Sequence, residues 1–247
     1  MEKRVLIVGL GGIGQALLKQ ALADPQTQQV VGLSRREIRL ELDGLEPEQA
    51  NASRLKLLQV GYQQPESYLP SLKPLAPFTH VWITLGMLQD KAQGIRPEKR
   101  FKSLDIEVAL AVTQTNCFLP MWILQQLLPL IDTQGRAKIA ILSARVGSIS
   151  DNRLGGWYSY RASKAALNMM IKTLSIELKR GSPELTLLGL HPGTVETDLS
   201  APFRGNVPEH KLFTAPFAAE KLWQVMERRG PEDSGLLFDW DNQLIEP

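Results

Sequence analysis

The chain has 247 residues, 43% of them hydrophobic and 22% charged, which is the composition of a folded globular protein with one buried core. Its formal net charge of +2 is too small to predict a nucleic-acid or membrane partner, and we expect neither. A single cysteine, Cys117, excludes an internal disulfide and a thiolate metal cage. Because no signal peptide or spanning segment is visible, we expect a cytoplasmic protein.

Short apolar runs alternate with longer amphipathic stretches along the whole chain. The apolar runs predict strands at Val5–Val8, Val30–Leu33, Leu55–Val60, Val81–Leu85, Lys138–Leu142, Leu185–Leu190 and Leu236–Phe238. Helical spacing of apolar residues predicts helices at Ile13–Ala23, Leu104–Ile131 and Ala162–Lys179. This alternation predicts an α/β fold, with a doubly wound parallel sheet between two helical layers. No linker or repeat divides residues 1–247, so we expect a single domain.

The first predicted strand leads directly into a glycine turn. Gly9, Gly11 and Gly14 have the spacing G-x-G-x-x-G. Glycines at these positions allow a tight turn and let a pyrophosphate approach the helix N-terminus, whose free N–H groups attract anions. Because the turn follows the first strand of a parallel α/β chain, we favour a dinucleotide site over a bare tight turn. Its candidate residues are Gly9, Gly11, Gly12, Ile13 and Gly14.

The end of the second predicted strand selects between two cofactors. Ser34 is followed by Arg35 and Arg36, where an NAD-selective site usually places an acid for the ribose hydroxyls. An arginine can bind a 2′-phosphate with two parallel hydrogen bonds. We therefore favour NADP, with Ser34 and Arg35 as binding residues; the alternative is that both arginines are solvated surface charges.

Tyr160 and Lys164 form the candidate catalytic pair. Four residues apart on a helix, they share one face, so the ammonium can lie close to the phenol. A nearby positive charge favours phenolate and lowers a tyrosine pKa that is ordinarily near ~10. A proton donor to a developing alkoxide needs such tuning. An exposed helix charge remains the alternative for Lys164.

Taken together, the glycine turn, Tyr160 and Lys164 resemble those of the short-chain dehydrogenase/reductase family. The tract from Ser143 to Lys164 is most like the C-factor branch of cell–cell signalling reductases. The resemblance implies a Rossmann-type fold, a catalytic serine at Ser143 after the fifth strand, and a helix asparagine at Asn116 that anchors a proton-relay water. It further implies nicotinamide contacts after the sixth strand, at Pro192, Gly193, Val195 and Thr197.

The chain departs from the family's usual pattern in four places. The glycine turn is one residue shorter than usual and lacks its threonine. Of the family's Asn-Asn-Ala-Gly segment after the fourth strand, only Gly86 is matched, and we assign it to the cofactor site. The acid that normally follows the third strand is absent near Gly61. Where members commonly use the second of two serines, this chain has Ala144, so Ser143 is favoured and Ser148 stays the alternative.

The mechanism that the resemblance implies is hydride transfer between NADP(H) and a carbonyl or alcohol substrate. Tyr160 would protonate the substrate oxygen, Ser143 would hydrogen-bond it, and Lys164 would bind the nicotinamide ribose. The C-terminal half would form the substrate pocket, and family members pair their helices between subunits, so a homodimer or homotetramer is expected. A different class of function is an NADP-binding regulatory or signalling protein whose turnover is incidental.

For several other residues that could carry chemistry, we predict no catalytic or metal-binding role. The three histidines, His80, His191 and His210, have no metal-ligand spacing, so we predict no metal site. Cys117 is expected to be a small core residue, and Trp157 a packing residue that can also line the substrate pocket. The segment from Leu199 to Thr214 is rich in proline, glycine and charge, and it suits a flap over a site or a plain surface loop equally well.

Overall fold

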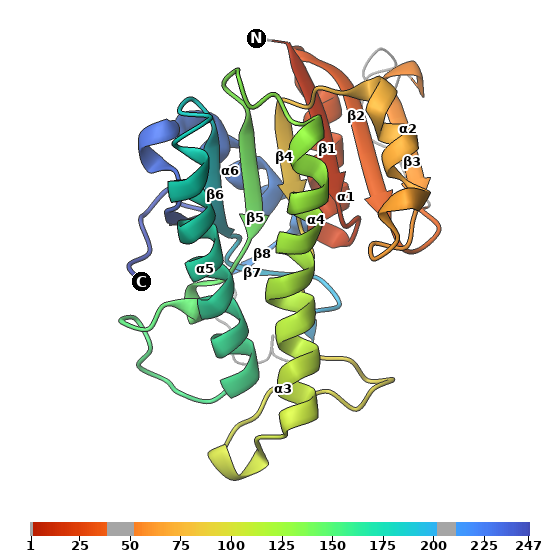
Figure 1. Ribbon diagram of the computed structural model, residues 1–247. Helices are drawn as coiled ribbons and strands as arrows, with labels where there is room; N and C mark the ends of the chain where they lie inside the picture. The colour runs from red at the N-terminus through yellow and green to blue at the C-terminus, as the bar shows by residue number, and fades with distance from the viewer. Residues whose placement is uncertain (1, 39–51, 202–210) are drawn as a thin grey trace.

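The computed structural model describes residues 2–38, 52–201 and 211–247. Its centre is a seven-stranded sheet with the order β3-β2-β1-β4-β5-β6-β9, in which every neighbouring pair is parallel. Figure 1 shows helices on both sides of this sheet. The order reverses between β1 and β4, so ligand-binding loops of such a sheet meet at this point of its carboxyl edge. The predicted Rossmann-type α/β fold is confirmed.

The strands of the large sheet are β1 (Lys3–Val8), β2 (Thr27–Ser34), β3 (Leu55–Gln59), β4 (His80–Ile83), β5 (Lys138–Leu142), β6 (Thr186–His191) and β9 (Leu237–Asp239), and a second, two-stranded sheet pairs β7 (Thr194–Val195) with β8 (Leu212–Phe213). The α-helices are α1 (Gly12–Ala23), α2 (Leu69–Leu72), α3 (Ile106–Thr113), α4 (Leu119–Leu127), α5 (Tyr158–Leu178) and α6 (Ala215–Arg228). Each predicted strand is present within a few residues of its predicted bounds.

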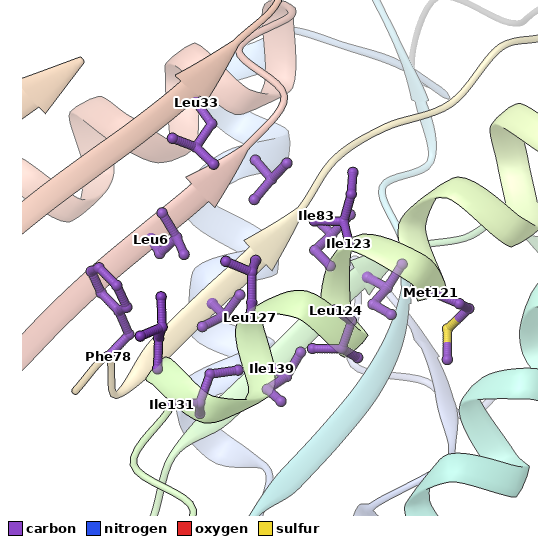
Figure 2. Packing of buried hydrophobic residues seen from close by; sticks show 14 of the residues in the cluster. Leu6, Leu33, Phe78, Ile83, Met121, Ile123, Leu124, Leu127, Ile131 and Ile139 are labelled. Carbon is purple, nitrogen blue, oxygen red and sulfur yellow. The ribbon is translucent and has the colours of Figure 1, made fainter. Parts of the chain in front are cut away.

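Two apolar cores lie on the two faces of the sheet. On one face, Leu6 and Val8 of β1 pack with residues of α4 and α5, such as Leu127 and Ile171. Figure 2 shows this core, with Leu124 and Leu127 of α4 lying over Ile139 and Ile83 of the sheet. On the other face, Val5 and Ile7 pack against α1 and α6. Both faces of the strands are thus buried, which explains their nearly continuous apolar sequences.

The predicted helix Leu104–Ile131 is wrong as a single element. The structure divides this stretch into α3, a π-helical segment (Gln114–Phe118), α4 and a final 3₁₀ turn (Leu128–Leu130). A π segment inserts an extra residue into the helix and commonly marks a functional position, and here it contains Asn116.

Two helix boundaries also differ from the prediction. Helix α5 begins at Tyr158, four residues before the predicted start, so Tyr160 lies in its first turn. Helix α6 was not predicted, although Thr214 caps it by accepting a hydrogen bond from the Phe217 N–H at 3.3 Å. Within the proposed flap at 199–214, residues 202–210 lie outside the described residues. No helix among the described residues is long and apolar enough to cross a membrane.

Candidate active site

The glycine turn has the geometry that its spacing predicts. Gly9 has φ +99°, a conformation that favours glycine, and its N–H donates to the Leu33 carbonyl at 2.9 Å. A Cβ on Gly14 would come within 1.9 Å of the Gly9 carbonyl oxygen, so only glycine allows this close approach of helix and turn. A Cβ on Gly11 would meet nothing within 4 Å, so there is free space next to this residue at the start of α1.

The first turn of α1 keeps its backbone donors available. No side chain caps Gly11, the residue before the helix, and the first turn contains no acidic side chain. The early N–H groups of a helix have no partner within the helix and carry its partial positive charge. Thr197 lies over this turn, because a Cβ on Gly12 would come within 2.8 Å of its methyl carbon. Only glycine at position 12 allows this close approach of Thr197 to the start of α1.

Arg35 lies at the end of β2, where the sequence predicts the 2′-phosphate site. Its guanidinium carbon is 5.8 Å from the centre of the Tyr62 ring, and its carbonyl accepts a hydrogen bond from Gln59 Nε2 at 3.3 Å. Arg35 is exposed, whereas Tyr62 is buried. Ser34 accepts a hydrogen bond from the Arg36 N–H at 3.1 Å, so its hydroxyl shapes the turn after the strand.

A cleft of about 1160 Å³ runs along the carboxyl edge from this point. Arg35, Arg36 and Tyr62 line one end of it, and Gly86 and Asp198 lie further along. Tyr160, Lys164 and Ser143 do not line this cleft. The structure therefore brings the predicted cofactor residues Arg35 and Gly86 to one cavity, with the predicted catalytic residues outside its lining.

Lys164 belongs to α5 and is buried, with its side chain reaching the last residue of β5. Its Nζ donates to the Leu142 carbonyl at 3.0 Å, and burial lowers its pKa to about 8. Burial raises the pKa of Tyr160 to about 12. The expectation that Lys164 lowers the pKa of Tyr160 is therefore wrong in this structure, because desolvation of the phenol dominates. A tyrosine with this pKa keeps its proton at neutral pH and can act as a proton donor.

Gly86 and Asn116 connect the cofactor edge to α5. A Cβ on Gly86 would lie 3.6 Å from both Asn116 Oδ1 and Lys164 Nζ. Asn116 is fully buried: its Oδ1 accepts from the Met87 N–H at 2.6 Å, and its Nδ2 donates to the Met87 carbonyl at 2.8 Å and to Ser163 Oγ at 3.0 Å. Its side chain thus fixes the segment after β4 against α5.

The two candidate serines have different surroundings. Ser143 follows β5 directly, and its Oγ donates to Asn168 Oδ1 of α5 at 2.5 Å. Ser148 belongs to the next turn, where its Oγ accepts from the Asp151 N–H at 3.1 Å and lies 3.3 Å from Ser150 Oγ. Ser143 is therefore the serine that shares a hydrogen bond with the helix that carries Tyr160.

The segment after β6 places four predicted nicotinamide contacts on one short path. Pro192 and Gly193 follow β6, and Val195 lies in β7, which pairs with β8. Thr197 then reaches the start of α1, as described above. His191, the last residue of β6, has a buried Nδ1 without a hydrogen-bond partner, and burial lowers its pKa to about 4.

Sequence reasoning missed two residues of this region. Thr84 follows β4, and its hydroxyl donates to the Gly9 carbonyl, tying the glycine turn to the next strand. Glu98 lies in the segment before α3 and contacts the first turn of α5, 61 residues away in the chain. The sequence offered one signal for Thr84, because its hydroxyl stands where the family usually has an asparagine. It offered no signal for the contact made by Glu98. In the part of the chain that the structure describes, no cluster of His, Cys, Asp or Glu could hold a metal ion.

Sequence comparisons agree with this geometry. Residues 3–207 match the model of a family described as short chain dehydrogenase. The chain is 38% identical over 144 residues to 1-hydroxy-2-glutathionyl-2-methyl-3-butene dehydrogenase of Rhodococcus sp. (strain AD45), covering 58% of this chain and 61% of that protein. It is 35% identical over 132 residues to the C-signal protein of Myxococcus xanthus, covering 53% of this chain and 73% of that protein. The second match confirms the resemblance to the C-factor branch.

Solved structures share the whole fold. The carbonyl reductase Sniffer of D. melanogaster superposes with a TM-score of 0.80 at 24% identity, covering 100% of both chains. A carbonyl reductase from chicken fatty liver with bound NADPH has a TM-score of 0.80 at 20% identity, covering 100% of this chain and 95% of that chain. A short-chain dehydrogenase/reductase from Burkholderia multivorans with bound NADP has a TM-score of 0.75 at 22% identity, covering 100% of both chains.

Proposed function

Because this chain belongs to the short-chain dehydrogenase family, we propose that it is an NADP-dependent oxidoreductase acting on carbonyl or alcohol groups. The observation that carries the proposal is the position of Gly86. It lines the cleft that contains Arg35, and it lies next to Asn116 and Lys164 on the catalytic side. One small residue thus connects a cleft that suits a charged cofactor to the buried Asn116 and Lys164.

The described residues fit a dinucleotide with a 2′-phosphate. The open turn at Gly11, Gly12, Ile13 and Gly14 presents backbone donors to a pyrophosphate, and Arg35 with Ser34 would hold the 2′-phosphate. Pro192, Gly193, Val195 and Thr197 would contact the nicotinamide end. Two structural relatives contain NADPH or NADP, which supports the choice of this cofactor for the present chain.

NADPH, when bound, supplies the hydride for carbonyl reduction. Tyr160 is protonated at neutral pH and would give that proton to the substrate oxygen, although the pKa of about 12 that burial imposes makes it a weaker acid than an ordinary tyrosine. Ser143 would turn its hydroxyl hydrogen from Asn168 Oδ1 to the same oxygen as negative charge develops there. The Lys164 ammonium would bind the nicotinamide ribose and offset the charge of the phenolate that remains.

Asn116 would support a proton relay through main-chain groups near it, and its side chain would not contact the relay water directly. Its Oδ1 and both of its Nδ2 hydrogens already have partners in Met87 and Ser163. A relay water would therefore have to bind main-chain groups of the π-helical segment that contains Asn116.

A regulatory function is the second candidate, favoured by the similarity to C-signal of Myxococcus xanthus. In a regulator, cofactor occupancy would change partner binding, and the proton donor would be dispensable. The two functions separate when the hydroxyl of Tyr160 is removed, because only the enzyme needs it.

We assign the whole chain to one NADP-binding domain with the substrate pocket in its C-terminal half, and place it in the cytoplasm as a homodimer or homotetramer. The assembly is supported by an apolar groove of about 560 Å³ between α4 and α5, lined by residues such as Trp122 and Met170. Met169 and Ile176 of α5 are also exposed beside it. Sedimentation of the wild type and of Met169→Lys tests this: a single monomeric species for both contradicts the assembly.

The proposed activity is tested by a panel of quinones, α-diketones and aldehydes with NADPH or NADH as electron donor. We expect carbonyl-dependent oxidation of NADPH with at least one class, and a lower rate with NADH. Oxidation of neither cofactor by any class contradicts the enzymatic function, and faster reaction with NADH contradicts the choice of cofactor.

A further inference from the structure

Helix α5 carries Tyr160 in its first turn, the part of a helix that depends most on capping. Its first N–H groups have no partner within the helix. The residue before the helix, Trp157, has φ +53° and makes no side-chain cap. Non-glycine residues rarely adopt this conformation, and they keep it only where the surroundings impose it. The start of α5 therefore needs partners from elsewhere in the chain.

Glu98 supplies these partners from the segment before α3. One carboxylate oxygen accepts from the Ser159 N–H at 3.2 Å, and the other accepts from the Ser159 hydroxyl. The Glu98 carbonyl accepts from the Trp157 N–H at 2.5 Å. Glu98 is only 5% exposed, so these contacts are shielded from water. A carboxylate at this end of a helix also meets the positive end of the helix dipole.

Arg161 holds the same turn from its carbonyl side. Gly155, Gly156 and Trp157 all have positive φ, at +61°, +66° and +53°. The Arg161 guanidinium donates to the Gly155 carbonyl at 3.2 Å and to the Gly156 carbonyl at 3.0 Å. The N–H groups of Trp157 and Ser159 thus donate to Glu98, and the carbonyls of Gly155 and Gly156 accept from Arg161. Glu98 and the guanidinium of Arg161 lie on the two sides of the turn 155–157 and together stabilise its unfavourable backbone conformation.

This turn places an aromatic ring against the proposed proton donor. The rings of Trp157 and Tyr160 meet edge to face with centroids 6.2 Å apart. Loss of the Glu98 carboxylate would remove both contacts to Ser159 and free the first turn of α5, which carries Tyr160, while the Glu98 carbonyl would still accept from the Trp157 N–H. A displacement of about 1 Å in a reacting group can lower a rate by roughly 10²-fold.

We propose that Glu98 is a positioning residue for Tyr160. Its carboxylate acts through Ser159 to hold the first turn of α5, and its main-chain carbonyl accepts from the N–H of Trp157, whose ring lies against the phenol. The inference rests on the proposed function for its effect on rate, but its effect on the order of α5 does not depend on any activity.

Two readouts test the proposal separately. Amide hydrogen exchange of residues 155–162 reports the order of the helix start, and kcat for NADPH-dependent carbonyl reduction reports the placement of Tyr160. In Glu98→Ala we expect faster exchange confined to this segment. We also expect kcat to fall roughly 10- to 100-fold, with NADPH affinity nearly unchanged. Glu107→Gln, at an exposed glutamate of α3, is the matched control and should change neither quantity.

Milder variants keep the test decisive if Glu98→Ala does not fold. Glu98→Gln retains one acceptor oxygen, and Ser159→Ala removes only the hydroxyl contact, so both should show smaller changes of the same kind. Adding Ser159→Ala to Glu98→Ala should have almost no further effect, since both act on one interaction.

Unchanged exchange in Glu98→Ala, or faster exchange with an unchanged kcat, overturns the positioning role. If the wild type reduces no carbonyl compound, the proposed function fails, and the exchange data alone decide whether Glu98 orders the start of α5. If the exchange is unchanged in that case, the inference fails as well.

Discussion

Both edges of the sheet bury a lysine and a histidine, but only one edge pairs them with acids. At the amino edge, Lys3 Nζ lies 2.6 Å from Asp24 and 3.2 Å from Glu227. His80 Nε2 lies 3.0 Å from the same Glu227, and its Nδ1 lies 2.9 Å from Thr79 Oγ1. Every charged group of this amino-edge network has a partner, which is how buried charge is usually tolerated.

At the carboxyl edge, the corresponding groups have no acid within hydrogen-bond distance among the described residues. Lys164 Nζ contacts only the Leu142 carbonyl, and His191 Nδ1 has no partner. Burial lowers the pKa of both side chains, to about 8 for Lys164 and about 4 for His191. Unpaired buried polar groups are costly, so their presence at the carboxyl edge is consistent with the proposed active site there.

The largest contrast is expected between the two lysines. Lys164→Met should lower carbonyl reduction by about 10²-fold or more, because the ribose and phenolate lose their cation. Its free energy of unfolding at pH 7 should be equal to or above that of the wild type, since an unpaired buried charge is removed.

Lys3→Met should do the opposite. It leaves Asp24 without its cation, so we expect a loss of about 1–3 kcal/mol in the free energy of unfolding with kcat unchanged. Chemical denaturation and initial rates measure the two effects. If replacing either lysine strongly changed both the free energy of unfolding and kcat, the two edges of the sheet would not differ in the way that we propose.

The serines sharpen the assignment within the carboxyl edge. Ser143→Ala should lower the rate constant of reduction by roughly 100-fold while NADPH still binds, because one donor to the developing oxyanion is lost. Ser148→Ala should have a small effect, since its hydroxyl serves the turn at Asp151. The reverse ranking in single-turnover kinetics would transfer the catalytic role to Ser148.

Arg35 tests the cofactor end of the cleft. Arg35→Ala should weaken NADPH binding by about 1.5–3 kcal/mol, or roughly tenfold or more, because a charge-assisted hydrogen bond to the 2′-phosphate is lost. NADH affinity should stay the same. Equilibrium titration of both cofactors measures this; retention of the NADPH preference in the variant contradicts the assignment.

The contribution of His191 to stability is expected to depend on pH. Burial, with Arg145 nearby, lowers its pKa from 6.5 to about 4. As pH falls through this window, the unfolded chain binds a proton that the folded chain does not, so stability falls between pH 6.5 and pH 4 and levels off below. Relative to His191→Gln, the wild type should lose roughly 3 kcal/mol across the window, because one pKa unit corresponds to about 1.4 kcal/mol. Parallel denaturation profiles for the two proteins would show that His191 is not buried as a neutral ring.

The sequence predicted the regular elements better than the contacts between them. Apolar runs and the glycine spacing indicated the strands, the parallel sheet and the open turn, because these depend on local pattern. The state of Tyr160 was not predictable, because its pKa depends on burial and on where Lys164 points. The contact between Glu98 and Ser159 joins residues 61 positions apart, and no local pattern indicates it.

Helix boundaries show a related limit. The apolar spacing at Leu104–Ile131 continues through the π-helical segment, so the extra residue around Asn116 leaves no trace in the pattern. Helix α6 was missed although Thr214, followed by Pro216 in the first turn, is a recognisable helix start. In the second case the signal was present in the sequence and was overlooked.

The central claim is that the carboxyl edge performs proton transfer, and Tyr160→Phe tests it most directly. The substitution removes one hydroxyl and nearly preserves packing against Trp157. With a quinone or α-diketone that the wild type reduces, we expect a loss of at least ~10²-fold in the rate constant of NADPH-dependent reduction. NADPH affinity should be unchanged, since in our proposal Lys164 and the glycine turn bind the cofactor. Full activity of the variant on that substrate would contradict the account and favour a regulator whose turnover is incidental.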